Sequence, residues 1–475
     1  MKNVLFIILS LLAFSVFAQQ NEISFSKELL SRAKAGDAQS QNDLARCYLN
    51  GYGVPANKVE ARKWFMKSAK QGNPVGQYNL GCCMLKGIGG KQDIYEGLAI
   101  LTKVADTNHD ISREALTMLG DCYNFGKEVQ KDITKANSYY IKASEKDSDT
   151  ASHNMGVHYM NGEGVETDTL IAIQYLRKAA DLGFVPSIRY LFAIYDQKKE
   201  LDQYYPEIRS WLQKSNEQGR TDSWAEVTLG NYYMRGIGGS KEPSSAFSLY
   251  SKNAENGSWA AMCVVGVCLY FGTGVEIDKD LANMWLEKAL NSGSGNACAF
   301  IGDILETGYT GIKDLKLAFE YYKKGAKLNH PRNQYKVGKM QIEGIGTERN
   351  ENEGLAWMQK ASDSVWGPAL YYLGNHAYNN KNWPIVIDNY LKLLSNSKYT
   401  MDDVIHGDIL KKLSACYRYG RGVEIDVKKA DEYMNEAAKY GNPDAVKIEE
   451  WLNQNQLEGL IQTNSIAQKK QITKF

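Results

Sequence analysis

Apolar residues recur along the chain with the spacing of amphipathic helices, in pairs of short segments joined by a turn. In residues 261–271 and again in residues 278–289, hydrophobic side chains follow one another every three or four positions, as they do on one face of an α-helix. The intervening Gly272 and Gly274 suit a turn, because glycine readily adopts the positive φ that ends a helix and reverses the chain. The pattern predicts a helical hairpin.

The same hairpin pattern repeats along almost the whole chain. Its reference point, here called the anchor, is an apolar residue usually followed by a small one, and it returns at steps of 36 to 40 residues. The anchors are Leu44, Leu80, Leu119, Met155, Leu191, Leu229, Val265, Ile301, Val337, Leu373 and Leu413. A period in this range is typical of solenoids, in which stacked hairpins bury a core that no single hairpin can bury. We therefore predict an all-α protein, an α/α superhelical solenoid of about eleven 36–40-residue helical-hairpin repeats with half-repeat caps.

Two further columns of residues refine this hairpin. Twenty residues after the anchor most units carry Trp or Tyr, and the register holds except in the tenth unit, where Tyr390 comes at seventeen. We expect the small residue after the anchor to let the two helices approach and the aromatic side chain to fill the space opposite. Acidic residues stand where second helices are expected to begin, and they suit capping of free N–H groups there. They are Asp132, Asp168, Asp278, Asp314 and Asp426.

These columns resemble the Sel1-like repeat family. The family pattern of an apolar-small pair, Gly-x-Gly, an acidic cap, Ala, an aromatic residue, Ala-Ala and Gly is nearly complete from Met155 to Gly183, and much of it recurs in the seventh and eleventh units. The resemblance implies an α/α superhelix related to tetratricopeptide arrays, with a hairpin turn a few residues longer. Two units depart from the pattern. The fifth has a charged stretch at residues 196–200 in place of the glycine turn, and the tenth has a short turn at residues 379–384, so we expect bends at both.

The first residues are typical of a secretory leader. Residues 1–18 contain a lysine, an apolar run and a small-residue cleavage motif that ends at Ala18, which is the pattern of a signal peptide. The apolar run is shorter than the roughly 20 residues that a bilayer requires. We therefore expect cleavage near Ala18, no membrane span after removal of the signal, and an extracytoplasmic protein that is periplasmic or secreted.

The two ends of the array are expected to be capped. Residues 24–36 align with a second helix alone, with Glu28 in the aromatic column, and Glu449 and Glu450 replace the apolar-small pair near the other end. The ranges to be assigned are residues 19–36 and 442–461. Polar faces are what terminal repeats need, since each exposes one side to water. We assign these ranges to N-terminal and C-terminal capping helices, residues 37–441 to the Sel1-like repeat solenoid and residues 462–475 to a flexible tail.

The charge of the chain disfavours nucleic acid as the main partner. There are 56 Lys and Arg against 55 Asp and Glu, with a formal net charge of +1, whereas binding to phosphate backbones requires a concentrated positive field. The hydrophobic fraction of 43% is ordinary for a folded protein and too high for a disordered one.

The eight cysteines leave three alternatives open. They are Cys47, Cys82, Cys83, Cys122, Cys263, Cys268, Cys298 and Cys416. All lie on expected first helices, and five share the position three residues after the anchor, where equivalent sites on successive hairpins stand about 10 Å apart, too far for a disulfide. Buried free thiols are favoured over disulfides, and a metal site is disfavoured because no Cys-x-x-Cys pattern is present. Some Sel1-like proteins staple the first helix of a unit to its second, but this chain has no second-helix cysteine.

No motif in the chain indicates catalysis or a cofactor. His153 and His158 are five residues apart, so they do not share a helix face as a metal pair would. Ser-x-x-Lys occurs at Ser24, Ser31 and Ser395 without the companion motifs of β-lactamases. The Gly-x-Gly turns follow helices rather than strands, unlike phosphate-binding loops. We expect no catalytic residue, no metal and no cofactor.

Function is then expected on the face that the first helices present. In related arrays, residues two before, two after and six after the anchor line the concave face, and here these positions vary from unit to unit. Tyr, Arg and Asn at such positions are suited to peptide and protein recognition. The candidate partner-binding residues are Asn231, Arg235, Tyr335, Lys339, Tyr371 and Asn375.

We interpret the chain as a non-catalytic scaffold or adaptor that binds a protein or peptide partner on its concave face. One alternative is an envelope-active enzyme, or a regulator of a cell-wall or glycan-processing enzyme, which convergent carboxylates with raised pKa in the groove would favour. Another is an adaptor of the eukaryotic endoplasmic reticulum, for which the sequence carries no retention signal. The sequence favours no particular partner and no particular oligomeric state.

Overall fold

The computed structural model describes residues 23–127, 129–396 and 399–447, and in these ranges it contains helices α2 to α23 and no β-strand. The signal peptide, the tail and most of the C-terminal capping helix that the sequence predicts lie outside the described residues. Helix α2 (Lys27–Lys34) falls within the range assigned to the N-terminal capping helix.

Contacts between residues divide the chain into two compact units. Unit 1 extends to Leu229 and includes Ile237–Gly239, and unit 2 comprises Gly230–Gly236 and the chain from Ser240 onward. Unit 1 contains α2, α3 (Ala38–Asn50), α4 (Lys58–Lys70), α5 (Pro74–Lys86), α6 (Ile94–Ala105), α7 (Ile111–Phe125), α8 (Ile133–Glu145), α9 (Asp149–Asn161), α10 (Thr169–Asp181), α11 (Val185–Gln197) and α12 (Leu201–Glu217). The division falls within α13 (Ser223–Arg235).

Unit 2 continues the same succession of helices. It contains α14 (Pro243–Glu255), α15 (Trp259–Phe271), α16 (Lys279–Thr307), α17 (Leu315–Lys327), α18 (Pro331–Glu343), α19 (Glu351–Asp363), α20 (Gly367–Asn379), α21 (Trp383–Leu394), α22 (Asp403–Tyr419) and α23 (Val427–Lys439). Helix α16 is two helices in one run, because the backbone of Ser294 leaves the helical region at φ 47° and ψ −124°. Its two parts are the second helix of the seventh hairpin and the first helix of the eighth.

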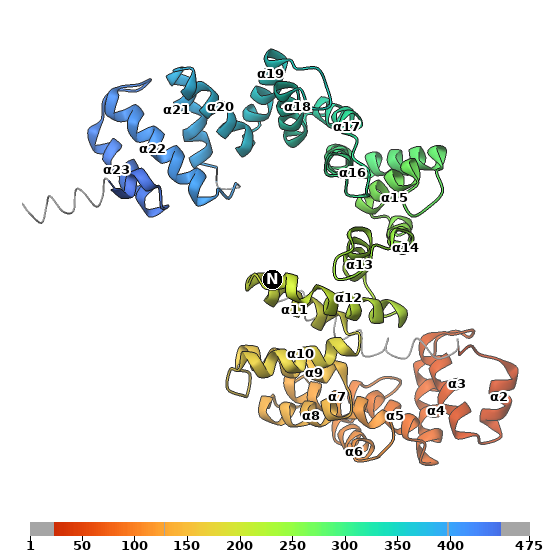
Figure 1. Cartoon of the computed structure of the whole chain (residues 1–475). Coiled ribbons are helices and arrows are strands. Elements are labelled where there is room, and N and C mark those ends of the chain that lie inside the picture. Colours follow the sequence, from red (N-terminus) through yellow and green to blue (C-terminus); the bar gives the residue numbers. More distant parts are fainter. Residues whose placement is uncertain (1–22, 128, 397–398, 448–475) are drawn as a thin grey trace, which may run out of the picture. The chain divides into compact units, whose positions relative to one another are not determined.

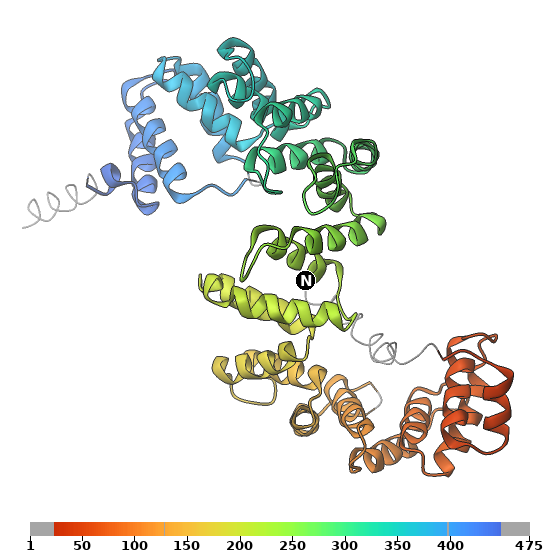
Figure 2. The ribbon, with the colours of Figure 1, turned by 45° about the vertical axis from the view of Figure 1, so that its right-hand side comes forward.

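Within each unit, consecutive helices pack against each other as hairpins, and consecutive hairpins stack (Figures 1 and 2). The glycine that follows most first helices adopts positive φ as predicted, for example Gly272 at 76°. The aspartates that the sequence places before second helices cap them, and the Asp278 carboxylate accepts a hydrogen bond of 2.9 Å from the N–H of Leu281. The structure confirms an all-α solenoid of helical hairpins.

The second glycine of the turn has a role in the contact between hairpins. A Cβ atom on Gly274 would lie 2.3 Å from the backbone of Pro243, the first residue of the second helix of the preceding hairpin. In the first hairpin the equivalent Gly53 approaches Ser24 and Phe25, just before α2. Helix α2 therefore occupies the place of a preceding second helix, which is what a half-repeat cap requires.

The core column lies one residue beyond the expected aromatic column. Side chains twenty-one residues after the anchor are buried in nearly every hairpin, whereas several of the aromatic side chains at twenty, such as Tyr139 and Trp357, are only half-buried. A Cβ atom on Gly120 would meet the ring of Tyr140 at 2.5 Å. The residue at twenty-one, and not the aromatic residue at twenty, fills the space opposite the small residue. The predicted packing column was therefore wrong by one position. One residue is about 100° around a helix, which decides which side chain faces the partner helix.

Four hairpins carry tyrosine in this buried column, and each tyrosine has the same kind of partner. The hydroxyl group donates to the Asp or Asn two residues after the anchor at 2.6 to 2.8 Å. The pairs are Tyr140 with Asp121, Tyr250 with Asn231, Tyr322 with Asp303, and Tyr390 with Asn375. Tyr390 belongs to this column because the tenth turn is shorter. The other seven hairpins have Phe, Leu or Met in the buried column and neither Asp nor Asn at the partner position, as expected when a buried hydroxyl needs an acceptor.

All eight cysteine side chains are buried free thiols. Burial raises the pKa of the Cys83 thiol to about 12, and it has the same effect on Cys263 and Cys268. Thiols of this kind act as small apolar core residues, because the reactive thiolate form is disfavoured.

Candidate partner-binding surface

The six candidate residues occupy three first helices of unit 2. Asn231 and Arg235 lie on α13, Tyr335 and Lys339 on α18, and Tyr371 and Asn375 on α20. Arg235 and Lys339 are exposed, and the other four are half-buried. Neighbouring residues on these helices are packed in the core. The base of each side chain is therefore held in place, and its tip reaches the surface.

Asn231 and Arg235 belong to a local cluster of hydroxyl and amide groups. The side-chain oxygen of Asn231 accepts hydrogen bonds from the hydroxyls of Tyr250 and Tyr309. Tyr309 comes from the turn of the eighth hairpin, two hairpins further along the chain. Burial raises the pKa of Tyr309, while its bond with Tyr250 and the charge of nearby Arg235 act in the opposite direction. Asn231 is thus a structural partner of two tyrosines as well as a surface group.

Tyr371 and Asn375 are tied to the next first helix, α22. The hydroxyl of Tyr371 donates to Asp408 at 3.2 Å, and the side-chain oxygen of Asn375 accepts from Tyr390 at 2.7 Å and from Lys412. Lys412 is in turn 2.7 Å from the Asp408 carboxylate. Both bonds use the oxygen of Asn375, whose side chain also forms a hydrogen bond with Tyr371. Burial raises the pKa of the Tyr371 hydroxyl, and this bond acts in the opposite direction.

Tyr335 and Lys339 are less engaged. The ring of Tyr335 packs against the core formed by Met358, Ala361, Ala369 and Leu373, and burial raises the pKa of its hydroxyl. The ammonium of Lys339 lies 3.9 Å from Glu343, one turn away on the same helix. A pair of that kind contributes only about 0.3–0.5 kcal/mol, so Lys339 is available to another anion.

Polar contacts link some neighbouring first helices of unit 2 but are absent from the boundary between α18 and α20 as the structure describes it. Arg332 and Lys336 on α18 pair with Asp303 and Glu306 on α16, and the bonds of Asn375 and Tyr371 join α20 to α22. In the part of the chain that the structure describes, no ion pair or hydrogen bond joins a side chain of α18 to one of α20. We call this boundary, with Tyr335, Lys339, Tyr371 and Asn375, the α18/α20 seam.

The structure therefore separates the candidates into two groups. Asn231 and Arg235 lie with Tyr250 and Tyr309, and the other four border the α18/α20 seam. No contact among the described residues joins the first group to the second. Asp303 lies at a position that the sequence places on the expected concave face. Sequence reasoning missed the other polar residues that flank these groups, namely Glu306, Arg332, Lys336, Asp408 and Lys412.

Two signals in the sequence could have revealed part of this network. Asp or Asn two residues after the anchor occurs only where tyrosine occupies the buried column, which marks these positions as hydrogen-bond acceptors. The eighth turn has Thr310 where most turns have their second glycine, directly after Tyr309. A turn that departs from the pattern can direct its side chains differently, and here Tyr309 reaches Asn231.

Glu306, a carboxylate on this face, does not have the raised pKa of a general acid. Burial acts to raise the pKa of Glu306, but hydrogen bonds from Lys336 and Tyr322 outweigh it and the pKa is lowered. A raised pKa is what the enzymatic alternative needs. In the described ranges no three His, Cys, Asp or Glu side chains are grouped so that they could hold a metal ion. No helix of these ranges is long and apolar enough to cross a membrane.

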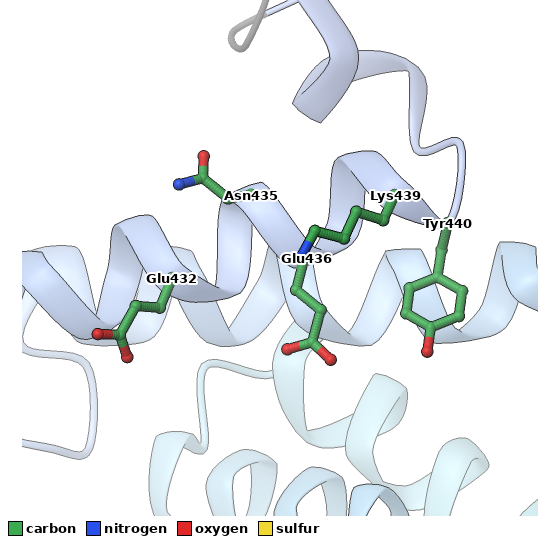
Figure 3. A pocket seen from close by; sticks show the side chains of 5 residues that line it. All are labelled: Glu432, Asn435, Glu436, Lys439 and Tyr440. Atoms are coloured by element: carbon green, nitrogen blue, oxygen red, sulfur yellow. The ribbon is translucent and has the colours of Figure 1, made fainter.

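A pocket of about 410 Å³ lies on the surface of α23, lined by Glu432, Asn435, Glu436, Lys439 and Tyr440. Figure 3 shows that Asn435 points away from Glu432 and Glu436. Side chains that diverge on one helix are typical of a solvated face, and they do not converge on a substrate as a ligand site requires.

The repeats themselves identify the family. The Sel1 repeat signature matches nine segments, which are residues 38–73, 74–109, 113–148, 150–184, 225–258, 259–294, 295–330, 334–364 and 410–442. Together they cover well over half of the chain. The chain belongs to the Sel1 repeat family. The fifth and tenth hairpins, whose turns depart from the pattern, are the two that fall outside the matches.

Proteins with related sequences share only part of their length with this one. The chain is 26% identical over 280 residues to chitin synthase regulatory factor 3 of Schizosaccharomyces pombe, covering 56% of this chain and 30% of that protein. It is 24% identical over 246 residues to an uncharacterized protein of Neisseria meningitidis serogroup B, covering 45% and 51%. The chain thus spans about a third to a half of these curated relatives.

Solved structures of Sel1 repeat proteins resemble this one. A protective antigen present in uropathogenic Escherichia coli strains, with an SLR fold, is 23% identical with a TM-score of 0.48, covering 91% of this chain and 94% of that one. A Sel1 repeat protein from Oxalobacter formigenes is 26% identical with a TM-score of 0.29, covering 54% and 89%. Sel1 repeats generally form non-catalytic scaffolds and often mediate protein interactions, and the fold of this chain is consistent with such a role.

Proposed function

We propose that the protein is a periplasmic or secreted Sel1 repeat adaptor that binds a protein or peptide partner on the concave, first-helix face of unit 2 and catalyses no reaction. The observation that carries the proposal is the α18/α20 seam. There, half-buried Tyr335 and the exposed, weakly paired Lys339 lie on α18, and half-buried Tyr371 and Asn375 lie on α20.

Such a seam suits a bound segment for physical reasons. Rigid tyrosine rings offer large contact area at a low cost in side-chain entropy, and residues of this type dominate protein interfaces. A partner that supplies an acidic or carbonyl oxygen to Lys339 and Asn375 replaces water without breaking an existing bond between α18 and α20. On the neighbouring boundaries the charged side chains are already paired with carboxylates, so a partner would have to compete with those contacts. The secretory pattern of residues 1–18 supports the location.

Reversal of two charges on this face is expected to abolish partner capture. Arg235→Glu combined with Lys339→Glu replaces two exposed cations by anions, and we expect recovery of the partner from envelope extract to fall more than tenfold, equivalent to about 1.4 kcal/mol or more. Helical circular dichroism should stay as in the wild type, because neither side chain contributes to the core.

The matched control reverses two exposed lysines of unit 2 on second helices. Lys288 and Lys360 lie over the rings of Trp285 and Trp357, so Lys288→Glu with Lys360→Glu changes the net charge equally on another surface. This control should retain capture. Equal capture by all three proteins, or equal loss in both variants, would sink the assignment of the first-helix face.

A further inference from the structure

The fifth hairpin is spanned by an ion pair between its two neighbours. Arg220 lies in the connection between α12 and α13, and its guanidinium donates to the carboxylate of Asp149, the first residue of α9. Helix α11 lies between these elements in the chain. Contacts in a solenoid ordinarily join only adjacent repeats, so this ion pair, like the bond from Tyr309 to Asn231, is a departure that requires an explanation.

The sequence supplies this arginine through a longer connection. In most connections the residue with positive φ is followed directly by the helix cap, as Gly257 is followed by Ser258. After Gly219 the cap is delayed by two residues, and Asp222 then caps α13 with a 2.9 Å bond to the N–H of Ala225. The two inserted residues are Arg220 and Thr221. The insertion thus provides the group that reaches Asp149.

Beneath the ion pair lies a buried histidine. His153 is one turn after Asp149 on α9, its side chain is 7% exposed, and its Nδ1 is 2.8 Å from the hydroxyl oxygen of Ser187 on α11. The imidazole ring packs against Phe184 at 5.4 Å and against Tyr190 at 6.3 Å between ring centroids. The polar and charged groups that face it are Ser187 and Tyr190 from α11 and Asp149 from its own helix, with Arg220 held on that carboxylate.

We propose that Arg220, Asp149 and His153 form an acid-sensitive latch that closes the fifth hairpin against its neighbours while His153 is neutral and releases it when His153 is protonated. The charged imidazolium has a second N–H to satisfy, and the Asp149 carboxylate, one turn away, is the anion within its reach. Satisfying it draws Asp149 away from Arg220. The cation also requires water, which the packing against Phe184 and Ser187 excludes.

The direction of the pH dependence follows from the burial of His153. Burial lowers the pKa of His153 to about 4, with Asp149 acting in the opposite direction. In the opened state the ring is hydrated and its pKa returns to about 6.5. Between these values the open state binds a proton and the closed state does not, so each unit of acidification raises the opening constant about tenfold. The latch has its full stability above about pH 6.5. As the pH falls from there to about 4, the opening constant rises by about 300-fold at the limit, and the latch loses the corresponding stability.

Hydrogen exchange of the full chain tests this latch. We expect the opening constant of α11 and of residues 218–222, corrected for the intrinsic effect of pH on exchange, to rise about 40-fold from pH 6.5 to pH 4.5. His153→Gln keeps a hydrogen-bonding group but cannot titrate, so its opening constant should change less than about threefold over the same range. Arg220→Gln should already show increased opening in this segment at pH 7.

Two control variants and one independent measurement complete the test. His158→Gln alters the other buried histidine of α9, which faces Asn137 and Glu163, and should keep the response of α11. Arg332→Gln removes an Arg–Asp pair between adjacent first helices of unit 2 and should leave exchange in unit 1 unchanged. The latch would be overturned if the opening constant of the wild type did not depend on pH. It would also be overturned if the pH response survived in His153→Gln, or if exchange in Arg220→Gln were the same as in the wild type. If His153→Gln does not fold, NMR titration of the wild type decides, since an apparent pKa for His153 near 6.5 contradicts it.

Discussion

Gly274→Ala is expected to destabilise the contact between the sixth and seventh hairpins by about 3 kcal/mol. Part of the loss, about 1–2 kcal/mol, comes from forcing alanine into a backbone conformation with φ 72°. The rest, about 1–3 kcal/mol, comes from the new methyl group, which would lie 2.3 Å from the backbone of Pro243 and must push α14 away. The measurement is the free energy of opening of α14 and α15 by hydrogen exchange, together with the urea midpoint.

Gly257→Ala is the matched control for this substitution. Gly257 also has positive φ, at 93°, but a methyl group there would meet no atom within 4 Å. It should cost only the conformational part, about 1–2 kcal/mol. The difference between the two variants isolates the close approach of the turn to the preceding second helix. Equal losses of stability in the two variants would mean that the second glycine is needed only for its positive φ and not for the stacking of hairpins.

Leu176→Tyr is expected to destabilise the fourth hairpin by about 3 kcal/mol, and Val157→Asn is expected to recover about 1–2 kcal/mol of that loss. Leu176 occupies the buried column opposite Gly156, as Tyr140 does opposite Gly120, but the hairpin has no acceptor two residues after its anchor. The new hydroxyl is therefore buried without a partner until Val157 becomes asparagine.

A double-mutant cycle on urea unfolding and hydrogen exchange measures this coupling. Val157→Asn alone, at a half-buried position, should change stability little. A cycle with no favourable coupling between the two substitutions would show that the tyrosine pairs of the other four hairpins arose without an energetic need for the acceptor.

Much of the local structure could be predicted from the sequence, because it depends on short-range chemistry. Positive φ at Gly272 and the cap at Asp278 follow from residue type and position in the pattern. The face of the second helix that packs in the core could not be predicted as well. Positions twenty and twenty-one after the anchor are both apolar or aromatic in most units, and a rotation of about 100° separates them. Only the packed structure shows that the second of them is the core column.

The candidate surface was predicted less completely than the fold. Residue types identified Tyr335 and Tyr371 as surface aromatics, and the structure leaves them half-buried beside the α18/α20 seam. It also shows that Asn231 and Asn375 accept hydrogen bonds from buried tyrosines. The sequence did not predict these bonds, because they join residues fifteen or nineteen positions apart on different helices. Contacts of that range depend on the three-dimensional packing of the hairpin and not on local spacing.

Site-specific photo-crosslinking tests the central claim most directly. A photoreactive phenylalanine analogue replaces Tyr371 at the α18/α20 seam in one protein and Tyr321, a half-buried tyrosine of the second helix α17, in another. The account predicts that the same discrete partner is crosslinked through position 371, that Arg235→Glu with Lys339→Glu removes the adduct, and that position 321 gives none. Equal crosslinking from both positions, or crosslinking from position 321 alone, would contradict the first-helix face as the binding surface.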